Sequence, residues 1–261
     1  LDRPNPAGRP IEGLTLRADW ESFVGAGAMP MRHGLTMGEM ARWFVATLKL
    51  DVDCQVIPMT GWQPDAAPGY GWPTGERSWV NPSPNAPNLS MARAYAGTVM
   101  LEGTTLSEGR GTTRPLEIFG APDLDAAALL RDMHGLAPQW LQGCRLRECW
   151  FEPTFHKHAG TQCHGVQIHV DDGAYQHERF QPWRLQALAF KAVLRQRADY
   201  PLWRDFAYEY EYDRLAIDLI NGSPLLRGWV EDASSTAADL DALTMPDEAA
   251  WREAREAFLL Y

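Results

Sequence analysis

Cysteine is scarce in this sequence, with only four residues in 261. Cys54, Cys144, Cys149 and Cys163 match neither the spacing of a zinc knuckle nor that of a redox motif. Four cysteines in a chain of this length also do not make a disulfide scaffold, because such scaffolds are short and dense in cysteine. We therefore expect buried free thiols, and the cysteines leave the redox compartment open.

The sequence also lacks a long apolar run and an excess of positive charge. No apolar stretch approaches the roughly 20 residues that a membrane-spanning helix requires, so we predict no membrane span. The formal net charge of −10 argues against nucleic acid as a partner, since binding to a phosphate backbone needs a cationic surface. The length of 261 residues suits one large globular domain or two smaller ones.

What the sequence does contain is one dense polar segment, residues 101–114, directly after the apolar run 97–101. It holds Glu102, Glu108, two arginines, several hydroxyl side chains and three glycines. Glycines permit positive φ and close backbone approach, so the side chains between them can converge on a ligand. A site for a polar substrate such as a sugar would explain this density. A structural turn held by arginine–carboxylate pairs would explain it equally well, and both interpretations stay open on the residues alone.

The first part of the chain carries an α/β pattern. Residues 36–39 form a capping-box signature, and apolar residues then recur at helical spacing to about residue 48. A short strand is predicted at 52–58, and a helix followed by a strand suits the closing half of a doubly wound α/β unit. Residues 63–90 are rich in Pro, Gly, Asn and Ser, which indicates a linker or a site-forming loop.

The second half of the sequence predicts a mixed α+β arrangement. The strand candidates are residues 97–102, 116–119, 144–152 and 165–171. The helix candidates are residues 123–133, 182–197, 213–221 and 246–260, and Gly222 is expected to end the third of them. In the last strand candidate, apolar residues alternate with Gln167, His169 and Asp171. One face of that strand is therefore expected to be apolar and the other polar.

Residues 102–115 resemble the hallmark of the exo-β-N-acetylmuramidase family, long known only as a domain of unknown function. Other matching segments follow in family order along nearly the whole chain, at residues 1–6, 22–25, 31–39, 59–62, 82–85, 119–122, 153–160, 163, 165–170 and 258–261. The resemblance implies that residues 1–80 are the C-terminal part of a Rossmann-like α/β domain and that residues 81–261 form an α+β C-terminal domain. The expected fold class is therefore α/β plus α+β.

The resemblance also implies a function, that of a bacterial glycoside hydrolase in peptidoglycan turnover and cell wall recycling. Such an enzyme releases terminal N-acetylmuramic acid (MurNAc) from peptidoglycan fragments such as MurNAc-GlcNAc, at an active site between the two domains. No cofactor and no metal are implied. A secreted or periplasmic location is favoured, and the oligomeric state is left open.

Family members are longer at the front, so we expect this chain to be an N-terminally truncated member. The expected truncation removes part of the Rossmann-like domain, including a loop that could carry a catalytic carboxylate. It would also leave an apolar helix face uncovered around Met40, Trp43 and Phe44. The alternative function is accordingly that of a non-catalytic saccharide-binding module.

Glu102 and Glu108 are the candidate catalytic residues. Most glycosidases use one protonated carboxyl group and a second carboxylate, about 5 to 9.5 Å apart. Glu102 follows an apolar strand candidate, where burial would favour the protonated form and suit the acid role. Glu108 lies two residues from Arg110, which would keep it ionised for work as base, nucleophile or electrostatic stabiliser. Alternatively, one or both carboxylates hold the loop together through Arg110 or Arg114.

Arg32, His33 and Arg110 are candidates for substrate binding. MurNAc differs from ordinary sugars by its lactyl carboxylate, for which a bidentate arginine is the natural partner. Arg110 is one candidate for that partner. Arg32, beside His33 in a glycine-containing turn, is the other, with a solvated loop arginine as its alternative interpretation.

Asn85, Lys157, Gln167 and His169 complete the binding candidates. Asn85 and Lys157 could bond hydroxyl or acetamido oxygens, or could be ordinary turn and surface residues. Gln167 and His169 share the polar face of one strand candidate. A zinc site is the less favoured alternative for His156, His158, Cys163 and His164, because His164 and His169 would point to opposite faces of that strand.

Overall fold

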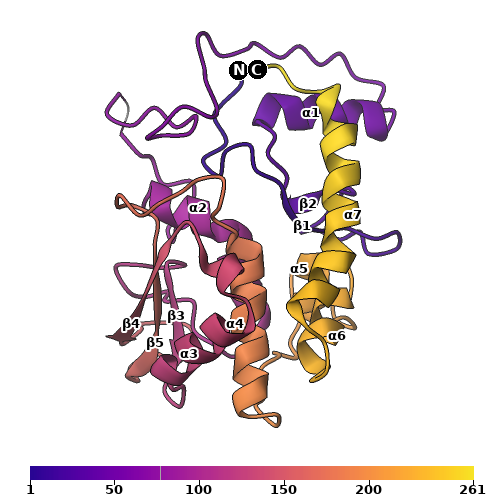
Figure 1. Ribbon diagram of the computed structural model, residues 1–261. Helices are drawn as coiled ribbons and strands as arrows, with labels where there is room; N and C mark the ends of the chain where they lie inside the picture. Colours follow the sequence, from indigo (N-terminus) through magenta and orange to yellow (C-terminus); the bar gives the residue numbers. More distant parts are fainter. Residues whose placement is uncertain (77) are drawn as a thin grey trace.

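The computed structural model describes residues 1–76 and 78–261 (Figure 1). In chain order the elements are β1 (Glu12–Thr15), β2 (Pro30–Arg32), α1 (Met37–Thr47), α2 (Leu89–Thr98), the 3-10 helix η1 (Val99–Gly103), β3 (Ile118–Ala121), α3 (Ala126–Leu136), the 3-10 helix η2 (Pro138–Leu141), β4 (Arg145–Phe151), β5 (Cys163–His169), α4 (Pro182–Gln196), α5 (Ala216–Asn221), α6 (Leu225–Glu231) and α7 (Ala237–Glu256). Helices and two small antiparallel sheets thus make up a mixed α and β structure, consistent with the α+β class.

The larger sheet forms one side of the main hydrophobic core. Its strands are antiparallel in the order β3-β5-β4. Phe119 of β3 and Val166 and Ile168 of β5 enter the core, which α3 and α4 complete. The neighbouring residues of β5 must then face the other way, because side chains alternate along a strand.

Helix α4 packs against α2, α3 and α6, and Glu12 of β1 binds its first turn. The backbone N–H groups of Trp183 and Arg184 donate to the carboxylate of Glu12 at 3.2 and 2.7 Å. The first N–H groups of a helix have no partner within it, so this carboxylate acts as a cap. The buried Arg184 side chain then pairs with Asp241 and Glu248 of α7. These contacts fix the N-terminal segment against the second half of the chain.

The apolar face of α1 is covered, contrary to our expectation. Trp43 is only 5% exposed, and its ring centroid lies 5.2 Å from that of Trp251. Met40 and Phe44 are partly buried against the same cluster. The reason is the long helix α7, which crosses α1 (Figure 1) and supplies the second tryptophan. The chain ends meet nearby, where the Tyr261 hydroxyl donates to Asp2 at 3.0 Å.

Two predicted strands are wrong. Residues 52–58 contain no regular element. Residues 97–102 are helical instead, because the Asn88 side chain accepts from the N–H of Met91 at 2.8 Å and starts α2. Gly97 lies so close to α4 that an added Cβ would sit 1.9 Å from the Pro182 carbonyl oxygen. The glycine therefore lets the two helices pack closely and does not mark a strand.

The remaining element predictions are largely confirmed. The capping box at Thr36 and Glu39 starts α1, and Gly222 ends α5 with φ of 65°. Helices α3 and α4 and strands β4 and β5 lie within a few residues of their predicted ranges. The last helix starts earlier than predicted, at a capping box on Thr236, and contains Pro246 within it. Helices α2 and α6 were not predicted.

The cysteines are free thiols, as expected, but not all are buried. Cys149 and Cys163 are buried, Cys144 is half-buried and Cys54 is exposed. Among the described residues no helix combines the length and the apolar character needed to cross a membrane.

Candidate functional site

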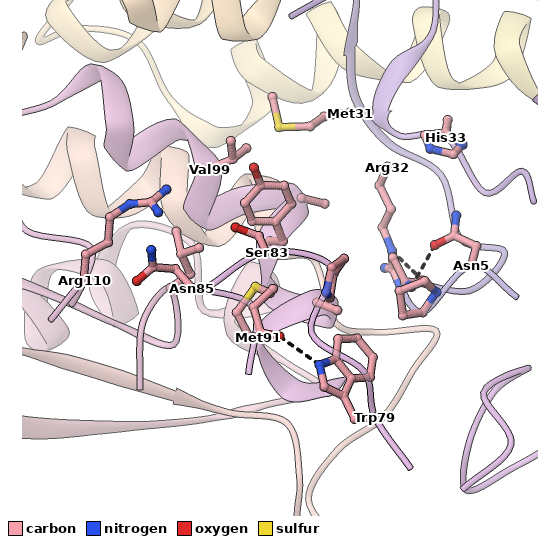
Figure 2. Close-up of a pocket in the computed structure, with 18 residues that line it drawn as sticks. Asn5, Met31, Arg32, His33, Trp79, Ser83, Asn85, Met91, Val99 and Arg110 are labelled. Carbon is pink, nitrogen blue, oxygen red and sulfur yellow. Dashed lines mark hydrogen bonds between the residues drawn. The ribbon is translucent and has the colours of Figure 1, made fainter. Parts of the chain in front are cut away.

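A cavity of about 510 Å³, here called the cleft, separates the N-terminal segment from helix α2 (Figure 2). Its walls come from residues 5–7, 31–33 and 79–86, from α2 and Val99, and from Arg110 and Leu116. Aromatic and aliphatic side chains predominate, with a small number of polar groups between them. A cavity of this size and lining is typical of a small-molecule site.

Arg110 is the cationic group at one end of the cleft (Figure 2), and two carboxylates hold it. Its Nε lies 2.8 Å from Oε1 of Glu108, and its Nη2 pairs with Oε1 of Glu102. The glycines on either side make this turn possible. Gly109 has φ of 72°, and an added Cβ would lie 2.4 Å from Ile118. The predicted convergence of Glu102, Glu108 and Arg110 is therefore present in the structure.

Glu108 is fully buried behind Arg110. Besides Arg110, it meets the ammonium group of Lys157 at 2.7 Å and Nδ1 of His156 at 3.2 Å. Burial alone would raise the pKa of Glu108, but Lys157 and His156 outweigh it and the pKa is lowered. Glu108 is thus held as an ionised carboxylate, as its neighbour Arg110 suggested. Its burial separates it from any molecule in the cleft.

Glu102 lies in η1, not at the end of a strand, so the premise for its acid role is wrong. Its side chain is 19% exposed. One oxygen pairs with Arg110, and the other accepts from the Tyr208 hydroxyl at 2.8 Å. Burial and the adjacent carboxylate raise the pKa of Tyr208, so its phenol stays a donor. Glu102 is thus held in place by two donors, one on each oxygen.

Arg32 is not a solvated loop arginine, since it belongs to β2 and is only 3% exposed. It contributes to the wall of the cleft, but its guanidinium donates to two backbone carbonyls. These are Phe180 O at 2.7 Å and Ala7 O at 3.0 Å. Burial lowers the pKa of Arg32. The observed contacts are structural, and Arg110 is the better placed arginine for a ligand in the cleft.

His33 has a defined tautomer. Its Nδ1 accepts from the backbone N–H of Leu35 at 3.0 Å, which leaves Nε2 as the protonated nitrogen. Burial and the nearby Arg255 lower the pKa of His33 to about 4. His33 is therefore a neutral hydrogen-bond donor on the wall of the cleft.

The other predicted binding residues fall into three places. Asn85 lies in the cleft (Figure 2). Lys157 donates to Leu101 O at 2.7 Å and Thr104 O at 3.0 Å, and burial lowers its pKa to about 8. Its contacts are thus internal. Gln167 and His169 do not line the cleft, and both contact Arg147 of β4.

Several residues at this site were not predicted from the sequence. Trp79 and Tyr95 line the cleft, and Trp79 donates to Ala86 O at 2.8 Å. Trp79 lies in residues 63–90, and the interpretation of that segment as a site-forming loop was the available signal for it. Tyr208 is about a hundred residues from Glu102 in sequence, and no local pattern links them. In the part of the chain that the structure describes, no three His, Cys, Asp or Glu residues group as metal ligands.

Comparison with known proteins identifies relatives of the chain. The family model described as "Exo-beta-N-acetylmuramidase NamZ, C-terminal" matches residues 93–261. The model described as "Exo-beta-N-acetylmuramidase NamZ, N-terminal" matches residues 1–90. The peptidoglycan beta-N-acetylmuramidase NamZ of Bacillus subtilis (strain 168) is 35% identical over 236 residues, which are 90% of this chain and 52% of that protein.

Two crystal structures of DUF1343 family proteins from Bacteroides fragilis NCTC 9343 are also similar. The first has a TM-score of 0.80 at 25% identity, and the second has a TM-score of 0.72 at 24% identity. Each comparison covers 100% of this chain and 65% of the solved chain. This chain thus spans about half the length of its curated relative and about two thirds of the solved ones. The matches to both family models, taken with the curated relative, show that the chain belongs to the exo-β-N-acetylmuramidase NamZ family.

Proposed function

We propose that the protein carrying this chain is an exo-acting β-N-acetylmuramidase that releases terminal MurNAc from peptidoglycan fragments such as MurNAc-GlcNAc. The proposed active site is the cleft, between a Rossmann-like part in residues 1–80 and an α+β domain in residues 81–261. Family membership supports the reaction class. The proposal rests mainly on the position of Arg110. Two carboxylates hold this arginine at the end of a cavity that is large enough for an amino sugar.

In this proposal Arg110 binds the lactyl carboxylate of MurNAc. Its contacts with Glu102 and Glu108 use Nη2 and Nε, and neither uses Nη1. The side chain is 20% exposed, so it can meet a ligand without leaving its partners. Both carboxylates raise the pKa of Arg110 against the effect of burial, which keeps it cationic. A fixed guanidinium suits a planar carboxylate better than a flexible ammonium does.

The two glutamates have different proposed roles. Glu102 does not line the cleft, but it is partly exposed and is held by Tyr208 and by Arg110, which does line it, so in this proposal it acts on the sugar from beside Arg110. Its two donors favour a nucleophilic or charge-stabilising role toward the oxocarbenium-like transition state of glycoside hydrolysis. Glu108 acts through Arg110 and Lys157 as a buried electrostatic support. His33 and Asn85 provide hydrogen bonds to the sugar from opposite parts of the cleft wall.

The lining of the cleft supports a saccharide ligand. Trp79 and Tyr95 offer ring faces, and Asn5, Ser83 and Asn85 offer polar atoms. Sugars present both apolar C–H faces and hydroxyl groups, so they need this combination. A non-catalytic saccharide-binding module is the second candidate, because Glu108, one of the two carboxylates expected from the sequence to be catalytic, is fully buried.

The proposed function is tested by following p-nitrophenol release from p-nitrophenyl β-N-acetylmuramide by the full protein that carries this sequence. We expect hydrolysis by the wild type and a loss of at least about 10²-fold in Glu102→Gln, as removal of a positioned catalytic group produces. Calorimetric titration of the chain with MurNAc-GlcNAc separates the two candidates. Binding with no hydrolysis supports the module, and neither binding nor hydrolysis contradicts both.

A further inference from the structure

A second cavity, of about 320 Å³, lies directly beside the cleft. Met31 and His33 belong to the walls of both cavities. The second cavity is lined mainly by aliphatic side chains and by the glycine-rich loop of residues 23–27, with Asn221 as a polar group. The two cavities are therefore consecutive chambers, divided by one methionine and one histidine.

Exposed aromatic residues stand at the outer end of the second cavity. Phe23 lines that cavity and is nevertheless 72% exposed. Its ring makes an edge contact with Tyr210 at 5.3 Å between centroids. Tyr210 is 77% exposed, and Tyr212 two residues on is 76% exposed. We call Phe23, Tyr210 and Tyr212 the aromatic ledge.

The backbone that carries the ledge is held in an unfavourable conformation. Tyr208 and Glu211 pair across a tight turn whose central residues, Glu209 and Tyr210, have φ of 45° and 72°. Positive φ is costly for residues other than glycine, and such strain gathers at functional sites. The turn holds Tyr210 out in solvent, while Tyr208 on the same turn donates to Glu102.

A second set of contacts ties the two loops of the ledge together. Arg214 pairs with Glu211 at 2.7 Å and donates to Asp19 O at 3.2 Å. Its guanidinium also lies 5.3 Å from the ring centre of Trp20. Phe23 and Tyr210 come from these two loops, so their rings are presented by a connected base and not by independent loops.

We propose that the second cavity and the aromatic ledge bind the sugars on the leaving-group side of the bond that is cut. This inference rests on the proposed function and states where the sugars that follow the terminal MurNAc bind. The terminal MurNAc occupies the cleft, the next N-acetylhexosamine passes Met31 and His33, and its apolar ring face packs on Phe23 and Tyr210. Exposed aromatic rings suit a pyranose, which has an apolar face and a polar edge.

His33 has a specific place on this path. It stands where the two chambers meet and carries its proton on Nε2. A neutral donor at that point can hydrogen-bond a hydroxyl of a sugar that lies between the two chambers. The substrate class is therefore a β-linked N-acetylhexosamine chain of at least two residues, in preference to a simple MurNAc glycoside.

The test compares two substrates on the full protein. One is the tetrasaccharide MurNAc-GlcNAc-MurNAc-GlcNAc, and the other is β-N-acetylmuramyl fluoride, whose leaving group is too small to reach the ledge. In Phe23→Ala and Tyr210→Ala we expect kcat/KM for the tetrasaccharide to fall about tenfold, while kcat/KM for the fluoride stays within about twofold. Trp150→Ala, which removes another exposed aromatic side chain, 58% exposed and on β4, is the control and should change neither value.

The possible results are distinguishable. If the ledge variants change kcat/KM equally for both substrates, or leave kcat/KM for the tetrasaccharide unchanged, the proposed role of the ledge is wrong. The proposed hydrolase activity is then unaffected. A wild type that hydrolyses neither substrate overturns the hydrolase. The ledge is then judged by titrating the wild-type chain with the same tetrasaccharide and following the ring resonances of Phe23 and Tyr210. Shifts at both rings support the ledge, and their absence contradicts it whatever the variants do.

Discussion

Nζ of Lys157 lies 2.7 Å from Oε2 of Glu108, and both side chains are removed from solvent. Lys157 also donates to the carbonyls of Leu101 and Thr104, so it ties the loop around residue 157 to the polar segment behind the cleft. Glu108 in turn holds Arg110. The position of the cationic group at the cleft therefore depends on a buried ion pair that does not line the cleft.

Glu108→Gln should reduce both activity and stability. The variant leaves the Lys157 ammonium buried without a carboxylate, and breaking a buried pair in this way costs about 3–5 kcal/mol. Urea unfolding measures the loss, and turnover of the chromogenic muramide should fall at least about 10²-fold. Adding Lys157→Met should recover much of the stability but not the activity. If Glu108→Gln had the same free energy of unfolding as the wild type, the ion pair between Glu108 and Lys157 would not be needed for stability.

Tyr208→Phe should lower kcat about 10- to 100-fold with little change in KM. Loss of a hydrogen bond to a charged group removes about 1.5–3 kcal/mol, and the ring that packs against Ala216 and Leu219 is retained. Tyr200→Phe is the matched control, because Tyr200 is equally buried and also donates to a carboxylate, that of Asp123. Equal kinetics for both variants would remove Tyr208 from the positioning of Glu102.

Arg184→Met should destabilise the fold without touching the cleft. The arginine is almost fully buried, and its guanidinium joins α4 to Asp241 and Glu248 of α7. We expect the free energy of unfolding to fall by about 3–5 kcal/mol. Arg197→Met removes the exposed pair with Asp123 instead and should cost less than about 1 kcal/mol. Similar losses for the two variants would contradict the assigned importance of Arg184.

Acid should destabilise the protein through His177. Burial lowers the pKa of His177 to about 3, with Arg32 and Arg93 adding to the effect. Below pH 6.5 the unfolded chain binds a proton at this histidine and the folded chain does not, so stability falls as the pH drops from 6.5 towards 3. The expected slope is about 1.4 kcal/mol per pH unit from this residue. In His177→Phe, which keeps a ring to stack on Tyr70, unfolding measured across this range should depend less steeply on pH.

Local signals were enough to predict the helices and strands that are determined locally. The capping box at Thr36 and Glu39 and the glycine after α5 are set by neighbouring residues, and each ends or starts a helix as expected. The apolar alternation of β5 likewise reports which residues enter the core. Where tertiary packing determines the secondary structure, the local sequence pattern gave a wrong prediction. The run at residues 97–102 is apolar because it packs around α4 as a helix, a contact that Gly97 permits and that no local pattern reveals.

The site was predictable where its residues are close in sequence. Glu102, Glu108 and Arg110 lie within nine residues, so the turn that holds them also brings them together. The burial of Arg32 was not predictable, because its partners, the carbonyls of Ala7 and Phe180, are remote from it in the chain. Gln167 and His169 share a face of β5 as expected, but that face does not line the cleft. Where β5 lies relative to the cleft depends on the whole fold, which the residue types of one strand do not reveal.

Arg110 is proposed to select the lactyl group of MurNAc in the cleft. The most direct measurement is the ratio of kcat/KM for p-nitrophenyl β-N-acetylmuramide to that for p-nitrophenyl β-N-acetylglucosaminide, in the full protein and in Arg110→Ala. We expect a wild-type preference for the muramide of about 1.5–3 kcal/mol, the range for a charge-assisted hydrogen bond. That preference should be lost in Arg110→Ala. A wild type without preference, or an Arg110→Ala variant that keeps it in full, would contradict the claim.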